Sequence, residues 1–291
     1  MELRVLRYFL AVAREESITA AAQALHVTQP TLSKQLMELE QELGKQLFLR
    51  GSRKITLTEN GMFLRRRAEE IVRLADKTEA DFQCAGENIS GEVCLGCGET
   101  EAIALAAHAL ADLRARHPGI RFNLFSGNGE DVTERLDRGM IDFALFVGLA
   151  ELKKYDYLRL PFVHHVGLLL RQDDPLAQHE AITPDDLRQT PLLCSRQMMI
   201  QNELAGWLGS SVQQLRLVGT YNLINNAGQM VLAGLGSALT IDHIANADIR
   251  GLCFRPLAPA LTMNVYLAWK KYPVFSKAAE KFLKTMQRTV Q

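Results

Sequence analysis

Residues 17–57 restrict the fold more than any other part of the sequence, because several short-range signals follow one another there in a fixed order. Ser17 can cap a short helix, Thr28 can cap a second helix with Pro30 in its first turn, and Gly44 can end it. The second helix has one apolar stripe, formed by Leu32, Leu36, Leu39 and Leu43. Two short apolar runs around a basic turn follow, at residues 48–50 and 55–57. This order predicts a winged helix-turn-helix, a unit that places one helix end against DNA.

The polar side of the second helix carries residue types that bind nucleic acid. Near its start, backbone amides can hold a phosphate together with Thr31 and Ser33. The side chains long enough to reach base edges in the major groove are Gln29, Lys34 and Gln35. Arg53 and Lys54 would lie over the DNA backbone or minor groove. A structural helical bundle with a polar solvent face is the alternative.

The whole set of residues resembles the LysR-type transcriptional regulators. The resemblance is carried by Leu3, Leu6, Phe9, Val12, Ala13, Ser17, Thr19, Ala21, Ala22, Leu25, Gln29, Pro30, Leu32, Ser33, Leu36, Leu39, Glu40, Leu43, Gly44, Leu47, Phe48, Arg50, Leu57, Thr58 and Gly61. It implies a dimeric winged helix-turn-helix over residues 1–58 that binds double-stranded DNA. The contacts it implies are Gln29, Pro30, Thr31, Ser33, Lys34, Arg50 and Arg53. Thr31 occupies a position where alanine or serine is commoner in the family. This difference affects the expected base preference of the helix but not its expected role in contacting DNA.

Residues 59–87 are expected to form a linker helix, and the stretch from 62 to 85 contains no glycine or proline. Leu57, Leu64, Ile71 and Thr78 are each seven residues apart, and Ala68, Ala75 and Phe82 form a second series with the same spacing. Heptad spacing favours a coil between two copies of the chain, and a dimer would read two DNA half-sites. A long helix packed on its own domain is the alternative. The resemblance implies a dimerisation helix; homodimer and homotetramer both stay open, and the family favours the tetramer.

From residue 91 onward, strands alternate with helices, which predicts an α/β domain with a parallel sheet. The first half resembles the family's effector domain through Pro118, Leu136, Gly139, Asp142 and Ala144. A similar second half includes a strand expected at Val166–Leu170. We expect one effector lobe from residues 91–160 and 262–291, and a second from residues 161–261. The resemblance implies that the two lobes form a clamshell like a periplasmic solute-binding protein.

Ligands of open parallel sheets bind beyond the carboxyl ends of the strands, and polar residues follow several strands of this chain. Matching the family residue by residue implies effector contacts at Thr100, Glu101, Asn128, Gln197, Tyr221 and Asn222. Helix amino ends at this edge favour an anion, such as the carboxylate of a small metabolite. Glu99 and Glu101 favour a cationic or hydroxyl-rich ligand instead, or cap a helix, so the charge of the effector stays open.

Five cysteines, at positions 84, 94, 97, 194 and 253, are expected to be reduced thiols. Cys94 and Cys97 have the CxxC spacing of metal and redox motifs. However, positions three apart in a strand point to opposite faces, which does not suit one zinc ion. Small buried cysteines are therefore favoured over a metal site. A redox-sensing regulator acting through Cys97 or Cys194 is the alternative function.

The remaining features argue against other classes of protein. A net charge of zero does not favour coating of nucleic acid through bulk charge. We expect no membrane span and no signal peptide, and therefore a cytoplasmic protein. No nucleophile elbow, metal motif or cofactor fingerprint is present, and His164-His165 fits a core or solvated pair better than a metal site. The sequence thus predicts a regulator that responds to a small-molecule effector. We expect it not to be an enzyme, and we expect neither a cofactor nor catalytic residues.

Overall fold

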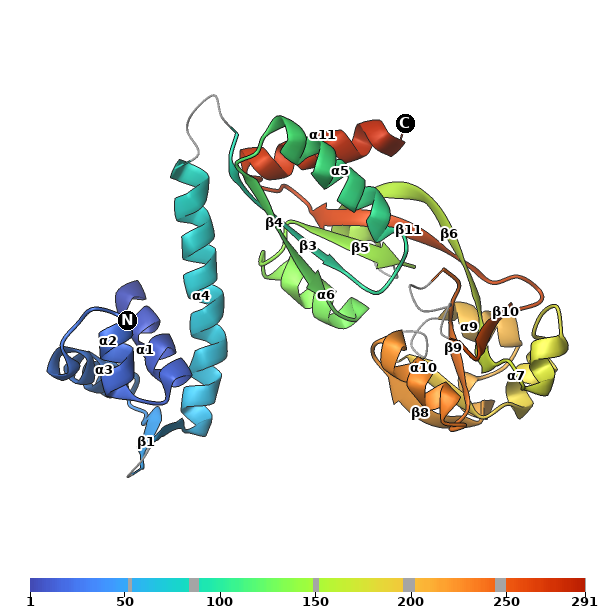
Figure 1. The fold of residues 1–291 in the computed structure, drawn as a ribbon, viewed down its shortest axis with the longest axis horizontal. Helices are drawn as coiled ribbons and strands as arrows, with labels where there is room; N and C mark the ends of the chain where they lie inside the picture. Colours follow the sequence, from blue (N-terminus) through green and yellow to red (C-terminus); the bar gives the residue numbers. More distant parts are fainter. Residues whose placement is uncertain (52–53, 84–88, 149–151, 196–201, 244–249, 291) are drawn as a thin grey trace. The chain divides into compact units, whose positions relative to one another are not determined.

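The computed structural model describes residues 1–51, 54–83, 89–148, 152–195, 202–243 and 250–290 of the chain (Figure 1). The chain divides into two compact units, Met1–Gln83 and Cys84–Gln291. Within the described ranges, no helix is both long enough and apolar enough to cross a bilayer.

The first unit is a winged helix-turn-helix followed by a long helix. Its elements are α1 (Leu3–Glu15), α2 (Ile18–Ala24), α3 (Gln29–Leu43), β1 (Phe48–Arg50), β2 (Ile55–Leu57) and α4 (Glu59–Gln83). The predicted wing is confirmed, since β1 and β2 pair antiparallel with Phe48 opposite Leu57. The helices meet over an apolar core that contains Phe9, whose ring centroid lies 5.2 Å from that of Phe48.

The ends of the short helices follow the capping signals of the sequence. Ser17 accepts a hydrogen bond from Ala20 N at 3.3 Å, and Thr28 accepts one from Thr31 N at 3.4 Å. Gly44 ends α3 in the left-handed conformation, with φ of 61°. These local contacts separate α2 from α3 and fix where the amino end of α3 begins.

The long helix α4 uses one face to complete the core of its own unit. Leu64 and Ala68 are buried in that core, and Val72 packs at its edge. The predicted heptad stripe is therefore divided, because Leu64 and Ala68 contact their own domain and Leu57 lies in β2 instead of the helix. The prediction of a coil along this stripe is wrong for these residues. A different face of α4 carries the exposed apolar side chains Phe63 and Leu74, and Ile71, a member of the predicted stripe, is also exposed, at 41%.

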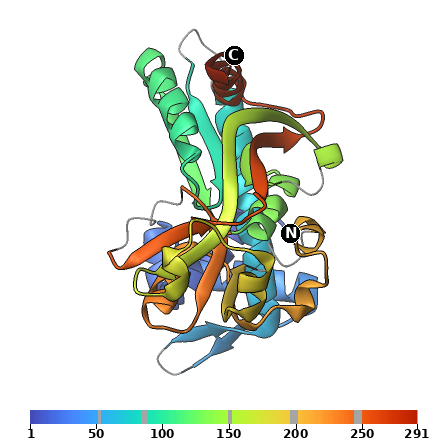
Figure 2. The ribbon, with the colours of Figure 1, turned by 90° about the vertical axis from the view of Figure 1, so that its right-hand side faces the viewer.

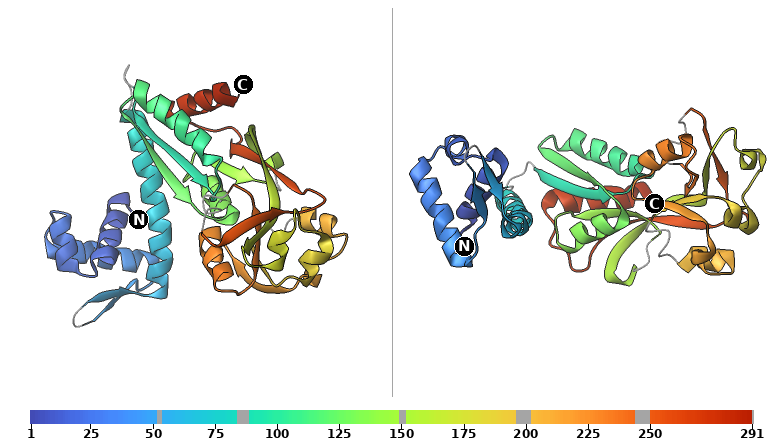
Figure 3. Two further views of the ribbon diagram at one scale, coloured as in Figure 1. Left: turned by 45° about the vertical axis from the view of Figure 1, so that its right-hand side comes forward. Right: turned by 90° about the horizontal axis from the view of Figure 1, so that it is seen from below.

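The second unit consists of two α/β lobes that share one sheet (Figure 2). Lobe I contains β3 (Gly91–Cys97), α5 (Ile103–Arg116), β4 (Ile120–Ser126), α6 (Gly129–Asp137), β5 (Phe143–Val147), the start of β6 (Tyr155–Arg171), β11 (Thr262–Lys270) and α11 (Lys277–Val290). Its strand β3 runs parallel to β4 and β5. Helices α5 and α11 lie side by side on one face of this part of the sheet, and α6 covers the other (Figure 3).

Lobe II repeats the same type of layering. It contains the end of β6, α7 (Pro184–Gln189), β7 (Leu192–Ser195), α9 (Asn202–Leu208), β8 (Leu217–Tyr221), α10 (Ile224–Leu232), β9 (Ser237–Ile241) and β10 (Leu252–Pro256). Short 3-10 helices lie at Leu152–Lys154, Pro175–Gln178 and Val212–Gln214. One core packs α7 and α9 against the sheet, and a second packs α10 against the opposite face.

Strand β6 joins the two lobes and corrects one prediction. Nine strands of the described chain form one sheet in the order β4-β3-β5-β11-β6-β9-β7-β8, with β10 paired to β6. The strand expected at Val166–Leu170 is only the end of β6, which begins at Tyr155. Residues 166–170 are all buried and form a continuous apolar run that the sequence pattern reveals. In residues 155–165, buried and exposed positions alternate irregularly, so the sequence pattern there does not indicate a strand. Pairing with β11 continues to His165, beyond the lobe boundary expected at residue 160.

Candidate DNA interface and effector pocket

The amino end of α3 is exposed to solvent. Thr28, Gln29, Pro30 and Thr31 are all exposed, and the hydroxyl oxygens of Thr28 and Thr31 lie 2.8 Å apart. The Thr28 hydroxyl accepts a hydrogen bond from the Thr31 amide, so the first turn is held together by its own side chains. A helix end of this kind presents hydroxyl donors and a partial positive charge to an anion such as a DNA phosphate.

The next turn of α3 adds a cation. The Lys34 side chain is 74% exposed, and its Nζ lies 3.8 Å from Glu38 Oε1. Gln35 donates to the other oxygen of Glu38 at 2.7 Å, while Ser33 is half-buried. An exposed ion pair one helical turn apart is worth only about 0.3–0.5 kcal/mol, so Lys34 can exchange Glu38 for a nucleic-acid partner at small cost.

The wing is fixed to α1. Ile55 N donates to Glu16 O at 2.9 Å, and Lys54 Nζ lies 2.9 Å from Glu16 Oε2. The backbone of Arg50 closes the hairpin opposite Ile55. Arg53, the other wing contact expected from the sequence, lies outside the described residues.

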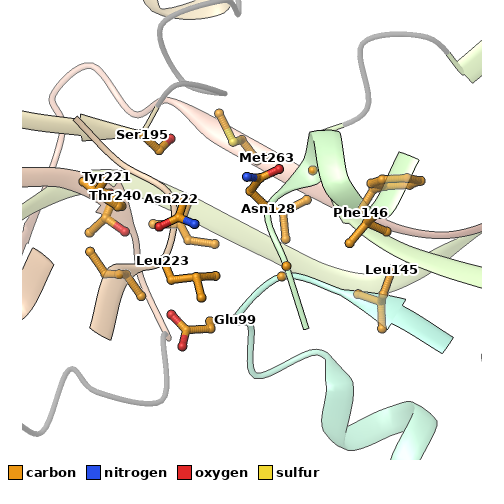
Figure 4. A pocket seen from close by; sticks show the side chains of 17 residues that line it. Glu99, Asn128, Leu145, Phe146, Ser195, Tyr221, Asn222, Leu223, Thr240 and Met263 are labelled. Atoms are coloured by element: carbon orange, nitrogen blue, oxygen red, sulfur yellow. The ribbon is translucent and has the colours of Figure 1, made fainter. Parts of the chain in front are cut away.

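A pocket of about 130 Å³ opens between the two lobes of the second unit (Figure 4). It lies at the carboxyl ends of β3, β4, β7 and β8, which is the edge of the sheet that the sequence predicts for a ligand. Its apolar wall includes Leu145, Phe146, Leu223, Ile224 and Met263. Its polar side chains are Glu99, Asn128, Ser195, Tyr221, Asn222 and Thr240.

Three of the six expected effector residues line this pocket: Asn128, Tyr221 and Asn222. Asn128 caps α6 by accepting a hydrogen bond from Asp131 N at 2.9 Å, which leaves its side-chain nitrogen to donate toward a ligand. Tyr221 offers its ring, because its hydroxyl donates to Leu239 O at 2.7 Å. Burial raises the pKa of Tyr221, so the hydroxyl stays protonated. Gln197 lies outside the described residues.

Thr100 and Glu101 do not line the pocket, and Glu99 does. The chain turns directly after Glu99, and the Thr100 hydroxyl accepts a hydrogen bond from Ala102 N at 3.3 Å within that turn. The Glu99 carboxylate accepts hydrogen bonds from Asn225, at 2.6 Å from its Nδ2 and 3.3 Å from its backbone N. In Figure 4, Glu99 lies on the same side of the pocket as Asn222 and Leu223. Among the described lining residues, Glu99 is the one charged side chain.

Thr100, His164 and Asp242 form a chain of hydrogen bonds in which Thr100 and His164 are buried and Asp242 is partly exposed. Thr100 Oγ1 lies 2.8 Å from His164 Nε2, and His164 Nδ1 lies 3.1 Å from Asp242 Oδ1. The order of groups is that of a hydrolase triad. However, Thr100 is only 4% exposed and is absent from the pocket lining, so a substrate in the pocket would not reach it. We therefore assign these hydrogen bonds a structural role and not a catalytic one.

The histidine pair lies partly in the core: His164 is 1% exposed, whereas His165 is exposed. Within the described ranges, no three His, Cys, Asp or Glu side chains are grouped to hold a metal ion. His165 Nδ1 instead lies 2.9 Å from Asp242 Oδ2.

The cysteines considered as redox sensors are buried free thiols. Burial raises the pKa of Cys97, and it raises the pKa of Cys194 to about 12. Because the thiolate is the form that reacts with oxidants, these surroundings disfavour oxidation of either residue.

Both units match known protein families. Residues 3–62 match the bacterial regulatory helix-turn-helix of the lysR family, and residues 86–291 match the LysR substrate binding domain. The transcriptional regulator BsdA of Bacillus subtilis is 32% identical over 197 residues, which cover 67% of each chain. HcaR, the hca operon transcriptional activator of Escherichia coli, is 29% identical over 276 residues, covering 93% of this chain and 92% of HcaR.

Solved structures share the fold of the full chain. CbnR in complex with its target DNA superimposes with a TM-score of 0.76 at 21% identity, covering 99% of this chain and all of CbnR. A full-length OxyR variant from Pseudomonas aeruginosa gives a TM-score of 0.56 at 20% identity, covering all of both chains. A winged helix-turn-helix in which the start of α3 is exposed and a two-lobed α/β domain with a pocket thus occur in one chain, and both match the same family. The chain belongs to the LysR family of bacterial transcription regulators.

Proposed function

We propose that the amino end of α3 reads operator DNA, with contacts from Gln29, Pro30, Thr31, Ser33 and Lys34. The exposed start of α3, with paired threonine hydroxyls and the solvent-exposed Lys34, is the observation that carries this proposal. Long polar side chains there suit base edges, and the hydroxyls suit phosphates. Arg50 and Arg53 of the wing complete the proposed set over the DNA backbone or minor groove.

The pocket between the lobes is the proposed site of a small-molecule effector. Asn128, Tyr221 and Asn222 are retained as proposed contacts, Glu99 is added, and Gln197 remains a proposal from the sequence. A pocket with a mainly apolar wall and a few convergent polar groups suits a small metabolite. Effector binding would change the relative positions of the lobes, and through them the affinity for DNA.

The proposed division of the chain assigns residues 1–58 to DNA binding and residues 59–87 to a linker helix. It assigns residues 91–160 and 262–291 to lobe I and residues 161–261 to lobe II. Self-association would use the exposed apolar face of α4, with Phe63 57% and Leu74 52% exposed. Two copies joined along α4 would read two half-sites, as homodimers or as pairs within homotetramers.

We propose regulation by ligand and not by catalysis or oxidation, in the cytoplasm where the chromosome lies. The buried Thr100 argues against a hydrolase, and the raised pKa of the Cys97 and Cys194 thiols argues against a peroxide sensor.

Selection from a library of random-sequence duplexes tests the DNA-binding proposal even when the operator sequence is unknown. The full-length protein should enrich one motif with two related halves. Failure to enrich any sequence over a nonspecific background would reject it. A thermal-shift screen with small metabolites tests the effector proposal, because a ligand that binds only the folded state raises the melting temperature.

A further inference from the structure

We propose that residues 98–101, the loop that follows β3 in lobe I, form a clasp that holds the two lobes closed over the pocket when no effector is bound. The inference rests on the proposed effector site and concerns its regulation. Its basis is that three consecutive residues of this one loop each take part in a contact toward lobe II: Glu99 and Glu101 bond to it directly, and Thr100 reaches it through His164 on the joining strand β6.

The first contact is between Glu99 and the start of α10 in lobe II. Leu223, the N-cap of α10, makes no side-chain capping hydrogen bond. Glu99 supplies an acceptor from the other lobe, at 3.3 Å from Asn225 N and 2.6 Å from Asn225 Nδ2. A carboxylate at a helix amino end also interacts favourably with the helix dipole. Separation of the lobes would leave the first turn of α10 without this acceptor.

The second contact passes through the strand that joins the lobes. Thr100 bonds to His164 on β6, and His164 bonds to Asp242, which follows β9 in lobe II. Thr100 and His164 are only 4% and 1% exposed. The two ring nitrogens of His164 thus join the Thr100 hydroxyl of lobe I to the Asp242 carboxylate of lobe II. Asp242 Oδ1 also accepts from His165 N at 3.0 Å, which holds the carboxylate in position.

The third contact involves Glu101. Its backbone N donates to His243 O at 3.2 Å, and its carboxylate lies 3.3 Å from His243 Nδ1. Both side chains are more than half exposed, so the ion pair itself contributes little. The backbone bond nevertheless ties the clasp to lobe II at a point distinct from Asn225.

These contacts share one short loop, so opening of the lobes would strain or break the bonds to Asn225, Asp242 and His243 together. The clasp also lies beside the pocket, because Glu99 is one of its lining residues. An effector that bonds to Glu99 or to the start of α10 would compete with the Glu99–Asn225 contact. Effector binding and release of the clasp would then be linked, with an energy set by the clasp contacts.

Hydrogen–deuterium exchange of the ligand-free, full-length protein tests the clasp, and it depends on neither DNA nor an effector. The variants are Glu99→Gln, which keeps the shape of the side chain, and Thr100→Val. Glu130→Gln is the matched control, because Glu130 is an exposed carboxylate at the amino end of α6 near the same pocket. The readouts are the amide of Glu101, in residues 98–104, and the amide of Asn225, in residues 222–228.

The clasp predicts coupling between amides that the substituted residue does not touch. Glu99→Gln should speed exchange at Glu101, and Thr100→Val should speed it at Asn225, each by about fivefold, with the core strands β3 and β11 unchanged. Glu130→Gln should change neither amide. Changes confined to the immediate neighbours of each substitution would overturn the clasp. Coupled exchange together with a thermal-shift screen that finds no effector would count against the proposed effector site and leave the clasp standing.

Discussion

Cys94 and Cys97 are buried on opposite faces of the sheet, although only two residues separate them in β3. Cys94 packs in the core beneath α6, together with Val132 and Phe146. Cys97 packs in the core beneath α5 and α11. Side chains that leave a strand in opposite directions cannot form a disulfide or share a metal ion without movement of the backbone. The CxxC spacing is therefore a product of strand packing in this chain.

The first prediction concerns thiol reactivity in the native protein. Because burial raises the pKa of Cys97 and brings that of Cys194 to about 12, both should stay unmodified in mild peroxide at neutral pH. Peptide mass spectrometry gives the measurement, and the same treatment in denaturant, where every thiol is accessible, is the control. Rapid formation of a sulfenic acid or disulfide at either residue in the native protein would revive the redox alternative.

The second prediction concerns the junction between the wing and α4. A Cβ atom on Gly61 would lie 2.1 Å from the carbonyl oxygen of Leu47, and the Gly61 amide donates to Thr58 Oγ1 at 2.9 Å. Gly61→Ala should therefore destabilise the first unit by about 2 kcal/mol or more, since neither backbone segment can move freely. Urea unfolding measures the change.

Gly206→Ala is the control for that substitution, because its Cβ would meet no atom within 4 Å and its position is helical. It should leave stability unchanged or raise it by up to about 1 kcal/mol. Equal stability of Gly61→Ala and the wild type would mean that the close approach at Leu47 is not a constraint.

The third prediction concerns self-association through α4. Leu74→Glu places a charge on the exposed apolar face of the helix, so sedimentation should show a smaller assembly and DNA binding should weaken. Met62→Glu is the matched control, because Met62 is 52% exposed but lies about 120° around the helix from Leu74. An unchanged assembly for Leu74→Glu would place the interface elsewhere.

Local signals explain why the first unit was predictable. Ser17, Thr28 and Gly44 act within a few residues of themselves, and each ends or begins a helix where the sequence indicates. The face of α4 that packs inward depends instead on contacts with α1, which lies far away in the sequence. The heptad spacing could not reveal that Leu64 and Ala68 are already buried.

The sequence predicted the location of the effector pocket, but only some of the residues that line it. The carboxyl ends of the strands converge as expected, and Asn128, Tyr221 and Asn222 line the pocket there. One tight turn after Glu99 removes Thr100 and Glu101 from it, and a turn of that kind depends on tertiary bonds such as the one from Thr100 to His164. The acidic character of that loop, to which Glu99 contributes, was the one sequence signal that could have indicated Glu99 as a pocket residue.

The most direct test of DNA reading by α3 compares two lysines, one in the helix and one just after its end, in DNA binding by the full-length protein. Lys34 lies near the amino end of the helix, whereas Lys45, also exposed, follows its C-cap and should not face the groove. Fluorescence anisotropy with a duplex carrying the selected motif, measured over a range of salt concentrations, gives both affinities. Lys34→Ala should weaken binding by about tenfold and lower the salt dependence, and Lys45→Ala should stay within about twofold of the wild type. Equal effects of the two substitutions, or no effect of Lys34→Ala, would contradict the assignment of the amino end of α3 as the DNA-reading surface.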